Sequence, residues 1–340
     1  MHGYNSEINK DEYIKQIIFF GISIIPMVII YFINYRKFVV PAYILYGISI
    51  IALIGVLFTE AKYGAKSWFD LKVFSYQPSE FMKLAYIICI SKILSNFDNI
   101  SKLLKKEIYK YIYAAVLFIL PFGLILLQPD FGTAIVYLVI TAFILFINKI
   151  KYRYILIAII LITLLIPVIY YFGLDEYQKH RIDVFLNPQL DPLDTGYNAI
   201  QAKIAVGSGM LFGTGYLKGV QTQFGYLPVK SSDFIFGVIS EELGFLTSSL
   251  IIVLFVILLA RIIKIGVETT DTFAKYIITG IAGMIFFHFV QNIGMSLGLL
   301  PITGLPLPFV SYGGSSLITN LLAIAIVLNI SARKVDNLFS

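Results

Sequence analysis

Three carboxylates mark the point where a polar, proline-marked stretch turns into an apolar run, in the segment LPVKSSDFIFGVISEELGF at Leu227–Phe245. Asp233 lies at the transition, and Glu241 and Glu242 follow roughly 12 Å farther along a helix. A partly desolvated carboxylate holds a proton more tightly and accepts one near neutral pH, so Asp233 is a candidate general base. Asp also favours the N-cap of a helix, where the dipole stabilises its charge, and the two roles are compatible.

Other acidic residues stand inside or beside apolar runs. Acids within membrane segments are usually partnered and face the bundle interior, so we interpret Glu241 and Glu242 as structural or supporting residues. Glu80 and Lys83 are spaced i, i+3, which predicts an intrahelical pair that supports its helix. Asp130, in QPDFGT, marks a helix break, where it either caps the next helix or lines a cavity.

Several further residues suit an anionic or sugar ligand. Arg181 and Lys203 are either solvated loop charges or contacts for a diphosphate, which the planar fork of arginine suits well. The glycine-rich stretch Gly207–Gly215 follows no strand of an α/β domain, so it fails as a dinucleotide-binding loop. It forms either an amide nest for phosphate or a tightly packed turn.

Two more features lie in predicted loops. The stretch SYGGSS, Ser311–Ser316, opens the last predicted helix, where free amides suit an anion and glycines equally suit close packing. Trp68, the only tryptophan, either anchors at the membrane interface or stacks on a sugar.

The composition predicts what holds these residues. The chain has 340 residues, of which 58% are hydrophobic and 14% are charged. Soluble domains carry about 25% charged residues, so this chain has too little polar surface for a water-soluble body. We predict an all-α polytopic membrane protein that forms one integral membrane domain over residues 1–340.

Apolar runs long enough to cross a bilayer predict about nine transmembrane helices. They lie near 16–34, 39–58, 79–95, 111–127, 134–148, 154–172, 235–260, 277–297 and 315–331. A large extracytoplasmic loop, residues 173–234, separates the sixth from the seventh and carries part of the expected active site. Short connections rich in Lys and Arg predict a cytoplasmic C-terminus and, with nine helices, an N-terminus outside.

The same reasoning excludes other classes. The net charge of +6 is explained by the basic membrane loops, so no nucleic-acid partner is expected. Cys89 is the only cysteine, so no intrachain disulfide can form, and the three histidines have no zinc-site spacing. Polar and glycine-rich segments cluster on the predicted outer side, which places function in a cavity there.

Five motifs in order then resemble a known family. They are GAKSWFDLKVFSYQPSEFMKLA, QPDFGTA, AIQAKIAVGSGMLFGTGYLKGVQTQFGYLP, SDFIFGVISEELG and NIGMSLGLLPITGLPLPFVSYGGSS. Together they resemble the RodA/FtsW/SpoVE (SEDS) family of bacterial cell-wall proteins over nearly the whole chain. The stretches LPVKSSDFIF and GLLPITGLPLPFVSYGGSS look more like the RodA, cell-elongation branch than the FtsW, division branch.

The resemblance implies a peptidoglycan glycosyltransferase that polymerises lipid II, an undecaprenyl-diphosphate-linked disaccharide, at the outer face of the bacterial cytoplasmic membrane. It implies membrane lipids as surroundings, a class B penicillin-binding protein as partner, and a divalent cation, Mg²⁺ or Mn²⁺, as the only cofactor. Asp233 matches the essential aspartate, the base that deprotonates the acceptor 4-hydroxyl. Trp68, Arg181 and Lys203 also match family positions, and we expect substrate contacts at these three residues and at Asp130, Gln221, Gln223, Ser311, Gly313 and Gly314.

The chain departs from the family pattern in two places. Family members often have Glu and then His-Thr before the aspartate, where this chain has Val229, Ser231 and Ser232, which affects fine positioning. The family has ten spanning helices and a cytoplasmic N-terminus, whereas this sequence begins with a stretch that reads like the loop after the first helix. We expect that a first helix is either encoded in frame upstream or lost.

Two other functions remain open at the level of sequence. A lipid II flippase would suit intramembrane Glu80, Lys83, Glu241 and Glu242, although no internal repeat is visible and the helix breaks cluster at one face. A non-catalytic scaffold for the transpeptidase would tolerate an amide at Asp233, so this residue separates the alternatives.

Overall fold

The computed structural model describes residues 6–61, 65–70, 75–104, 108–147, 179, 183–185, 187–191, 195–227 and 229–334. The chain divides into two compact units. The bundle unit comprises Asn5–Ile144, Leu254–Phe289 and Pro308–Ser340, and the loop unit comprises Leu145–Val253 and Val290–Leu307.

The bundle unit is made of helices with one small hairpin. Its elements are α1 (Ser6–Phe32), the 3₁₀ helix η1 (Tyr35–Val39), α2 (Ala42–Val56), β1 (Phe69–Asp70), β2 (Ser75–Tyr76), α3 (Pro78–Leu104), α4 (Ile108–Leu126), α5 (Phe131–Ile147) and α12 (Gly314–Lys334). Two further helices belong to both units. Helix α10 (Ile235–Glu268) begins in the loop unit and ends in the bundle unit, and α11 (Thr272–Ser296) begins in the bundle unit and ends in the loop unit. The strands β1 and β2 pair antiparallel, with Phe69 opposite Tyr76.

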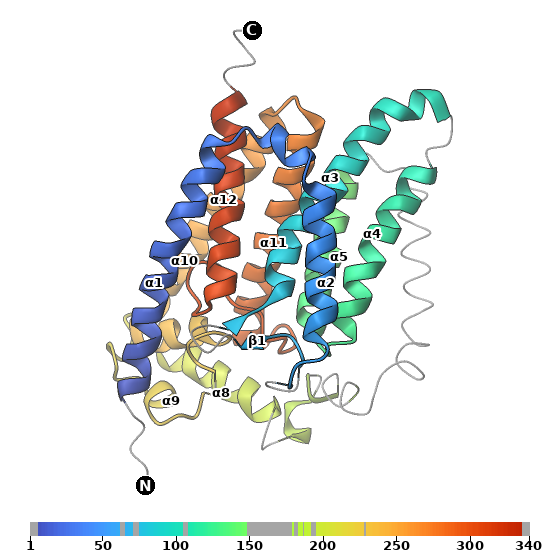
Figure 1. Ribbon diagram of the computed structural model, residues 1–340. Helices are drawn as coiled ribbons and strands as arrows, with labels where there is room; N and C mark the ends of the chain where they lie inside the picture. Colours follow the sequence, from blue (N-terminus) through green and yellow to red (C-terminus); the bar gives the residue numbers. More distant parts are fainter. Residues whose placement is uncertain are drawn as a thin grey trace. The chain divides into compact units, whose positions relative to one another are not determined.

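Apolar side chains cover the outside of these helices. Figure 1 shows α1 and α12 running side by side, and α1 still exposes large apolar residues along its length, including Ile17, Phe20 and Ile25. Among the described residues, five helices are long and apolar enough to cross a membrane, and α2 and α5 are shorter apolar helices. Apolar side chains exposed along a whole helix are unfavourable in water, so these helices require lipid around them.

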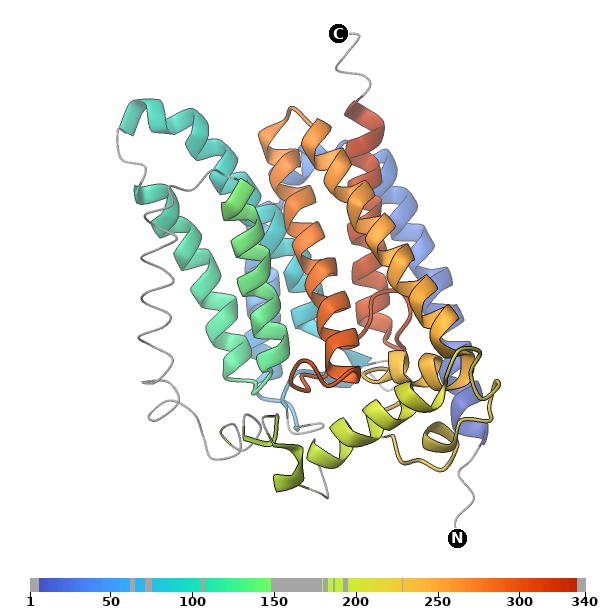
Figure 2. The ribbon, with the colours of Figure 1, turned by 180° about the vertical axis from the view of Figure 1, so that it is seen from behind.

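The predicted spans agree well with these elements. Eight of the nine fall on α1–α5 and α10–α12, and the span 154–172 lies outside the described residues. In the bundle unit, the β1–β2 hairpin, the α4–α5 turn and the start of α12 lie at one end, and η1 and the α10–α11 turn lie at the other (Figures 1 and 2). The side of the membrane that each end faces stays a prediction.

The end that holds η1 is tied together by polar contacts. Asp271 Oδ1 accepts the amide of Phe273 at 2.9 Å and so caps α11, while its Oδ2 accepts Tyr35 Oη at 2.8 Å and Arg36 Nε at 3.3 Å. Asn329 Nδ2 donates to the carbonyl groups at the end of α1. Free helix ends need such partners, so these contacts fix α1 against α12.

The loop unit contains helices where the sequence predicted only a loop. The 3₁₀ helix η3 (Pro188–Leu190), α8 (Thr195–Ser208) and α9 (Val220–Gln223) all fall within 173–234. Helix α8 turns Ala202 and Ala205 inward, and these pack with Leu227 and Phe234 in a small core. Spacing of i, i+3 places both alanines on one face, which is why α8 forms against this core.

Helix α10 is broken near its start. Gly244 has φ 77° and ψ −176°, so the helix consists of a short first part and a long second part. A β-carbon at Gly244 would lie 2.2 Å from the amide nitrogen of Gly213, so a larger residue would clash with the neighbouring loop backbone. Glycine is required here both for its positive φ and for this close approach.

Candidate functional site

Asp233 lies in a tight turn directly before α10. The amides of Ser232 and Asp233 donate to the carbonyl of Val229 at 3.3 and 3.1 Å, and Val229 itself has φ 47°. The Ser232 hydroxyl donates to Asp233 Oδ1 at 2.8 Å, and the Asp233 residue is half-buried. The turn therefore positions the carboxylate and leaves the residue partly exposed at the protein surface.

A second segment fixes the backbone of Asp233. Asn292, which is fully buried on α11, donates through Nδ2 to the carbonyls of Asp233 and Leu305, both at 2.8 Å. Gly304 has φ 69°, and a β-carbon there would lie 3.3 Å from Asp233 Oδ2. The segment 297–307 thus packs closely against the carboxylate at a glycine, where a side chain would crowd Oδ2.

Lys203 contacts the same segment. It lies on the exposed side of α8, and a β-carbon on Gly298 would lie 1.7 Å from its Cε, so the lysine stem covers that glycine. The core residues Ala202 and Phe234 are the sequence neighbours of Lys203 and Asp233. One small core and one glycine-rich segment therefore hold a cation and a carboxylate in the same unit.

Glu241 and Glu242 hold the loop after α8. Buried Glu241 accepts the amides of Gln221 and Thr222 at 2.7 and 3.0 Å and the Thr222 hydroxyl at 2.6 Å. Glu242 accepts Gln223 Nε2 at 3.2 Å. Buried charge is tolerated when it is hydrogen-bonded, and here it fastens α9 to α10.

The glycine-rich stretch Gly207–Gly215 packs backbone against backbone. The amides of Thr214 and Gly215 donate to the carbonyls of Glu241 and Glu242 at 2.9 and 3.0 Å. A β-carbon on Gly209 would lie 1.7 Å from the carbonyl oxygen of Ser240. Of the two interpretations given above, the structure has the tightly packed turn, because these amides are already bonded to the broken helix.

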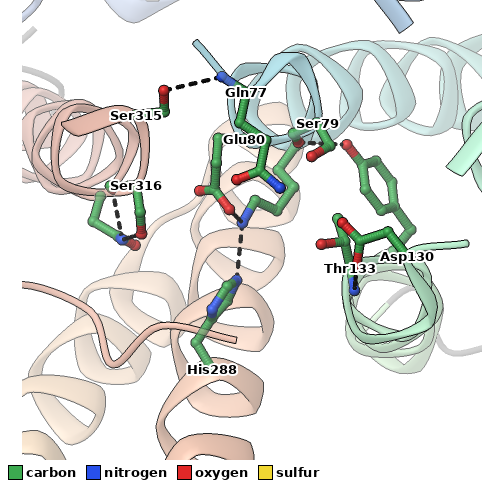
Figure 3. A network of polar contacts seen from close by, with 11 residues as sticks. Gln77, Ser79, Glu80, Asp130, Thr133, His288, Ser315 and Ser316 are labelled. Carbon is green, nitrogen blue, oxygen red and sulfur yellow. Dashed lines mark hydrogen bonds and ion pairs between the residues drawn. The ribbon is translucent and has the colours of Figure 1, made fainter. Parts of the chain in front are cut away.

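The bundle unit has its own polar cluster, in α3 and α11. Lys83 Nζ donates to Glu80 Oε1 at 2.7 Å and lies 2.9 Å from His288 Nε2 (Figure 3). The side chains of Lys83 and Glu80 are only 1% and 2% exposed. Tyr137 Oη donates to the nearby carbonyl of Ser79 at 2.8 Å. The pair predicted from the i, i+3 spacing is present, and His288 extends it to a second helix.

Asp130 caps α5. Its Oδ1 accepts the amide of Thr133 at 3.1 Å, which is the N-cap geometry that the sequence left as one of two options. Burial raises the pKa of Asp130, the bonds from Thr133 oppose that shift, and the charge of Glu80 adds to it. Figure 3 shows Asp130 and Thr133 at the start of their helix.

The start of α12 is bonded to α1 and to the hairpin. Gln16 on α1 donates to the carbonyl of Ser311 at 3.0 Å and accepts the amide of Gly313 at 3.3 Å. A β-carbon on Gly314 would lie 2.9 Å from the ring of Phe19. Ser315 Oγ accepts the amide of Gln77 at 3.1 Å. These contacts show close packing at the glycines of SYGGSS.

The remaining predicted substrate contacts are dispersed. Trp68 is half-buried beside β1, in the bundle unit. Gln221 and Gln223 belong to α9 and are bonded to Glu241 and Glu242 through the amide of Gln221 and the side chain of Gln223. Arg181 lies outside the described residues. In the loop unit, Lys203 and Asp233 both contact the segment 297–307, at Gly298 and at Gly304.

Comparison with known proteins identifies the family. The family model described as "Cell cycle protein", for FtsW, RodA and SpoVE, matches residues 4–336. The chain belongs to the FtsW/RodA/SpoVE family.

Individual members of the FtsW/RodA/SpoVE family are similar over most of the chain. The peptidoglycan glycosyltransferase MrdB of Escherichia coli K12 is 38% identical over 85% of this chain and 77% of its own length. The peptidoglycan glycosyltransferase RodA of Treponema pallidum is 33% identical over 98% of this chain and 93% of its own length. A chain in a solved peptidoglycan synthase complex superposes with a TM-score of 0.82 at 30% identity, over 95% of this chain and 90% of that one.

Family membership confirms the predicted fold class, a helical polytopic membrane protein. Sequence reasoning missed Asn292 and His288, although both are polar residues within an otherwise apolar run, a pattern typical of residues that face the bundle interior. It also missed the break at Gly244, because a single glycine in an apolar run is equally compatible with a continuous helix.

A divalent cation at the site would need partners beyond the protein. Among the described residues, no three His, Cys, Asp or Glu side chains gather into a metal-binding group. Mg²⁺ is usually held by one or two carboxylates together with substrate phosphates and water, so a bound diphosphate would have to supply most of its ligands. The cation stays a proposal, and it would supply positive charge beside that diphosphate.

Proposed function

We propose that this protein is a peptidoglycan glycosyltransferase that polymerises lipid II into glycan strands for cell elongation and shape. The match to the FtsW/RodA/SpoVE family over residues 4–336 supports the activity. The observation that carries the residue assignment is the environment of Asp233. Its backbone is fixed by Asn292, and its half-buried carboxylate lies against the backbone at Gly304.

Asp233 acts as the general base in this proposal. Its carboxylate takes the proton of the acceptor 4-hydroxyl while that oxygen attacks the anomeric carbon of the donor sugar. The bond between the anomeric carbon and the diphosphate oxygen breaks, and undecaprenyl diphosphate leaves with the electron pair. A diphosphate leaves without a strong general acid, so one carboxylate suffices where glycosidases use two.

Positive charge beside the leaving group completes the chemistry. Lys203 is an exposed residue of α8 whose stem contacts Gly298, and it makes no ion pair within the described part of the chain. Such a flexible ammonium group suits a diphosphate. Arg181 is the second proposed cation, and Trp68 is the proposed platform for a sugar.

The reaction takes place at the outer face of the bacterial cytoplasmic membrane in this proposal, where the charge pattern puts Asp233. A class B penicillin-binding protein is the proposed partner. The likeness to a chain of a peptidoglycan synthase complex supports an assembly of this kind.

The test is polymerisation of purified lipid II by the full chain in detergent, with and without its cognate transpeptidase. Detergent removes the two sides of a bilayer, so a flippase gives no product while a polymerase gives glycan strands. We expect strands that lengthen with time and stay uncrosslinked when the transpeptidase is blocked. An intact complex that forms no strands would contradict the proposal.

A further inference from the structure

The loop after α8 exposes a compact set of large apolar side chains. Met210, Leu211 and Phe212 are 79%, 57% and 79% exposed. We call these three residues the apolar tip. Monomeric proteins seldom expose adjacent large apolar residues in water, so this tip needs an occupant.

The spanning part of α10 gives the membrane level at this place. After Gly244 the helix carries no charged residue before Arg261, which is exposed and marks one boundary of the hydrocarbon region. A bilayer core about 30 Å thick takes about 20 helical residues, so the helix from Gly244 to Arg261 spans most of it and the other boundary lies near the break. Phe245 and Leu246 are 62% and 54% exposed, and they belong to the first turn of the helix inside that boundary.

Backbone bonds hold the apolar tip at the same level. The amide of Phe245 donates to the carbonyl of Met210 at 2.8 Å, and the amide of Leu246 donates to the carbonyl of Leu211 at 3.3 Å. The tip and the outer turn of the spanning helix are therefore direct neighbours. Where Phe245 and Leu246 face lipid, the tip faces lipid as well.

The loop also meets the main condition for irregular backbone in a bilayer. Such backbone enters the hydrocarbon only where its amides and carbonyls are bonded within the protein. The amides of Gly213, Thr214 and Gly215 donate to the carbonyls of Gly209, Glu241 and Glu242 at 2.7, 2.9 and 3.0 Å. The break at Gly244 supplies the acceptors and donors that this loop requires.

The residues that follow the tip suit the bilayer surface. Tyr216, Lys218 and Tyr226 are exposed in the same loop, and tyrosine and lysine are enriched where an apolar body meets headgroups. We propose that Met210, Leu211 and Phe212 form a re-entrant tip that inserts among phospholipid acyl chains and anchors the loop unit to the bilayer. The anchor belongs to the segment that leads from Lys203 to Asp233.

Depth measurements on the full chain in phospholipid vesicles test this inference without reference to activity. Cys89 is the only cysteine and is buried, so single-cysteine variants are made in a Cys89→Ala background. A fluorescent label is placed by Phe212→Cys, with Met210→Cys as a second tip position in case the first fails to fold. Leu246→Cys provides the reference on the spanning helix, and Lys218→Cys provides the reference at the surface.

Two quenchers then report the surroundings of each label. We expect a lipid with a nitroxide high on its acyl chain to quench the tip label as strongly as the label at 246. We expect aqueous iodide to quench the tip label several-fold less than the label at 218. Iodide quenching equal to that at 218 would overturn the inference, because the tip would then lie in water. Shielding from both quenchers would also overturn it, in favour of a protein partner or a second copy.

Discussion

Asp233 and Glu80 both lie near the start of a helix, yet their surroundings differ. Glu80, in the bundle unit, is 1% exposed and bonded to the ammonium group of Lys83 at 2.7 Å. Asp233, in the loop unit, is half-buried, accepts a serine hydroxyl, and lies next to a glycine with positive φ. A carboxylate paired with a buried lysine contributes to structure, whereas a partly exposed carboxylate can meet a substrate.

The comparison extends to the elements around each residue. Glu80 belongs to a regular helix whose neighbours are other helices, so its pairing follows from spacing alone. Asp233 depends on the turn from Val229, on Asn292 from α11 and on the segment 297–307. The site is therefore built from several distant stretches of chain, and each of them can be perturbed separately.

Breaking the buried pair should produce the largest loss of stability. In Lys83→Met the carboxylate of Glu80 keeps its burial and loses its partner, which destabilises the fold by about 3–5 kcal/mol. The unfolding midpoint of the purified protein measures this. The double variant Glu80→Met with Lys83→Met is the control, and it should recover most of the stability. A single variant as stable as the wild type would refute the structural role.

Removing the charge of Glu241 should loosen the loop after α8. Glu241→Gln weakens three bonds to Gln221 and Thr222, and bonds to charged groups contribute about 1.5–3 kcal/mol each. Hydrogen exchange at those amides should become faster, while exchange in α5 stays unchanged. Glu242→Gln is the matched control, since Glu242 accepts one longer bond, and it should show a smaller change. Equal effects of the two variants would contradict the account.

Asn292 holds the backbone of Asp233 in the loop unit. Asn292→Ala removes the bonds to the carbonyls of Asp233 and Leu305, each contributing about 1 kcal/mol. If the residue positions the base, kcat for polymerisation should fall about 10-fold with KM unchanged. Gln291→Ala, which loses a 2.7 Å bond to Pro301 in the same segment, should retain more activity. A rise in KM alone would show that Asn292 serves binding and not positioning.

The smallest effect is expected at Asp130, where the pH dependence gives the test. Because burial raises the pKa of Asp130, its neutral form favours the folded state. The contribution of Asp130 to the free energy of unfolding should be fully present below the unfolded pKa of about 3.9. It should decline as pH rises through the folded pKa. Asp130→Asn keeps a good cap and removes this decline, so the variant should be at least as stable as wild type at pH 7. Unfolding midpoints across acidic pH measure it, and identical pH profiles would contradict it.

The sequence predicted the elements that depend on local pattern. Eight predicted spans fall on helices because long apolar runs are readable without knowledge of contacts, and Glu80 with Lys83 was readable from spacing. Asp233 stood out because it marks the change from polar to apolar residues. The fold class followed from the same apolar runs.

The contacts between distant segments could not be predicted. Asn292 reaches Asp233 across 59 positions, and His288 reaches Lys83 across 205. The tight packing of the stretch Gly207–Gly215 depends on the break at Gly244. Residues next to the break form backbone hydrogen bonds with this stretch, which lies about 30 residues earlier in the chain. Helix α8 was missed because its buried face consists mainly of two alanines, which give a weak apolar signal.

The most direct measurement is lipid II polymerisation by Asp233→Asn, with Glu268→Gln as the control. Glu268 is an exposed carboxylate at the other end of α10, 4.0 Å from the ammonium group of Lys264, so its replacement should leave polymerisation unchanged. Both variants are first shown to have wild-type unfolding midpoints and to bind lipid II. We predict that Asp233→Asn loses at least about 10²-fold in rate while Glu268→Gln keeps wild-type activity. A folded, substrate-binding Asp233→Asn variant that polymerises at the wild-type rate would contradict the assignment of Asp233 as the base.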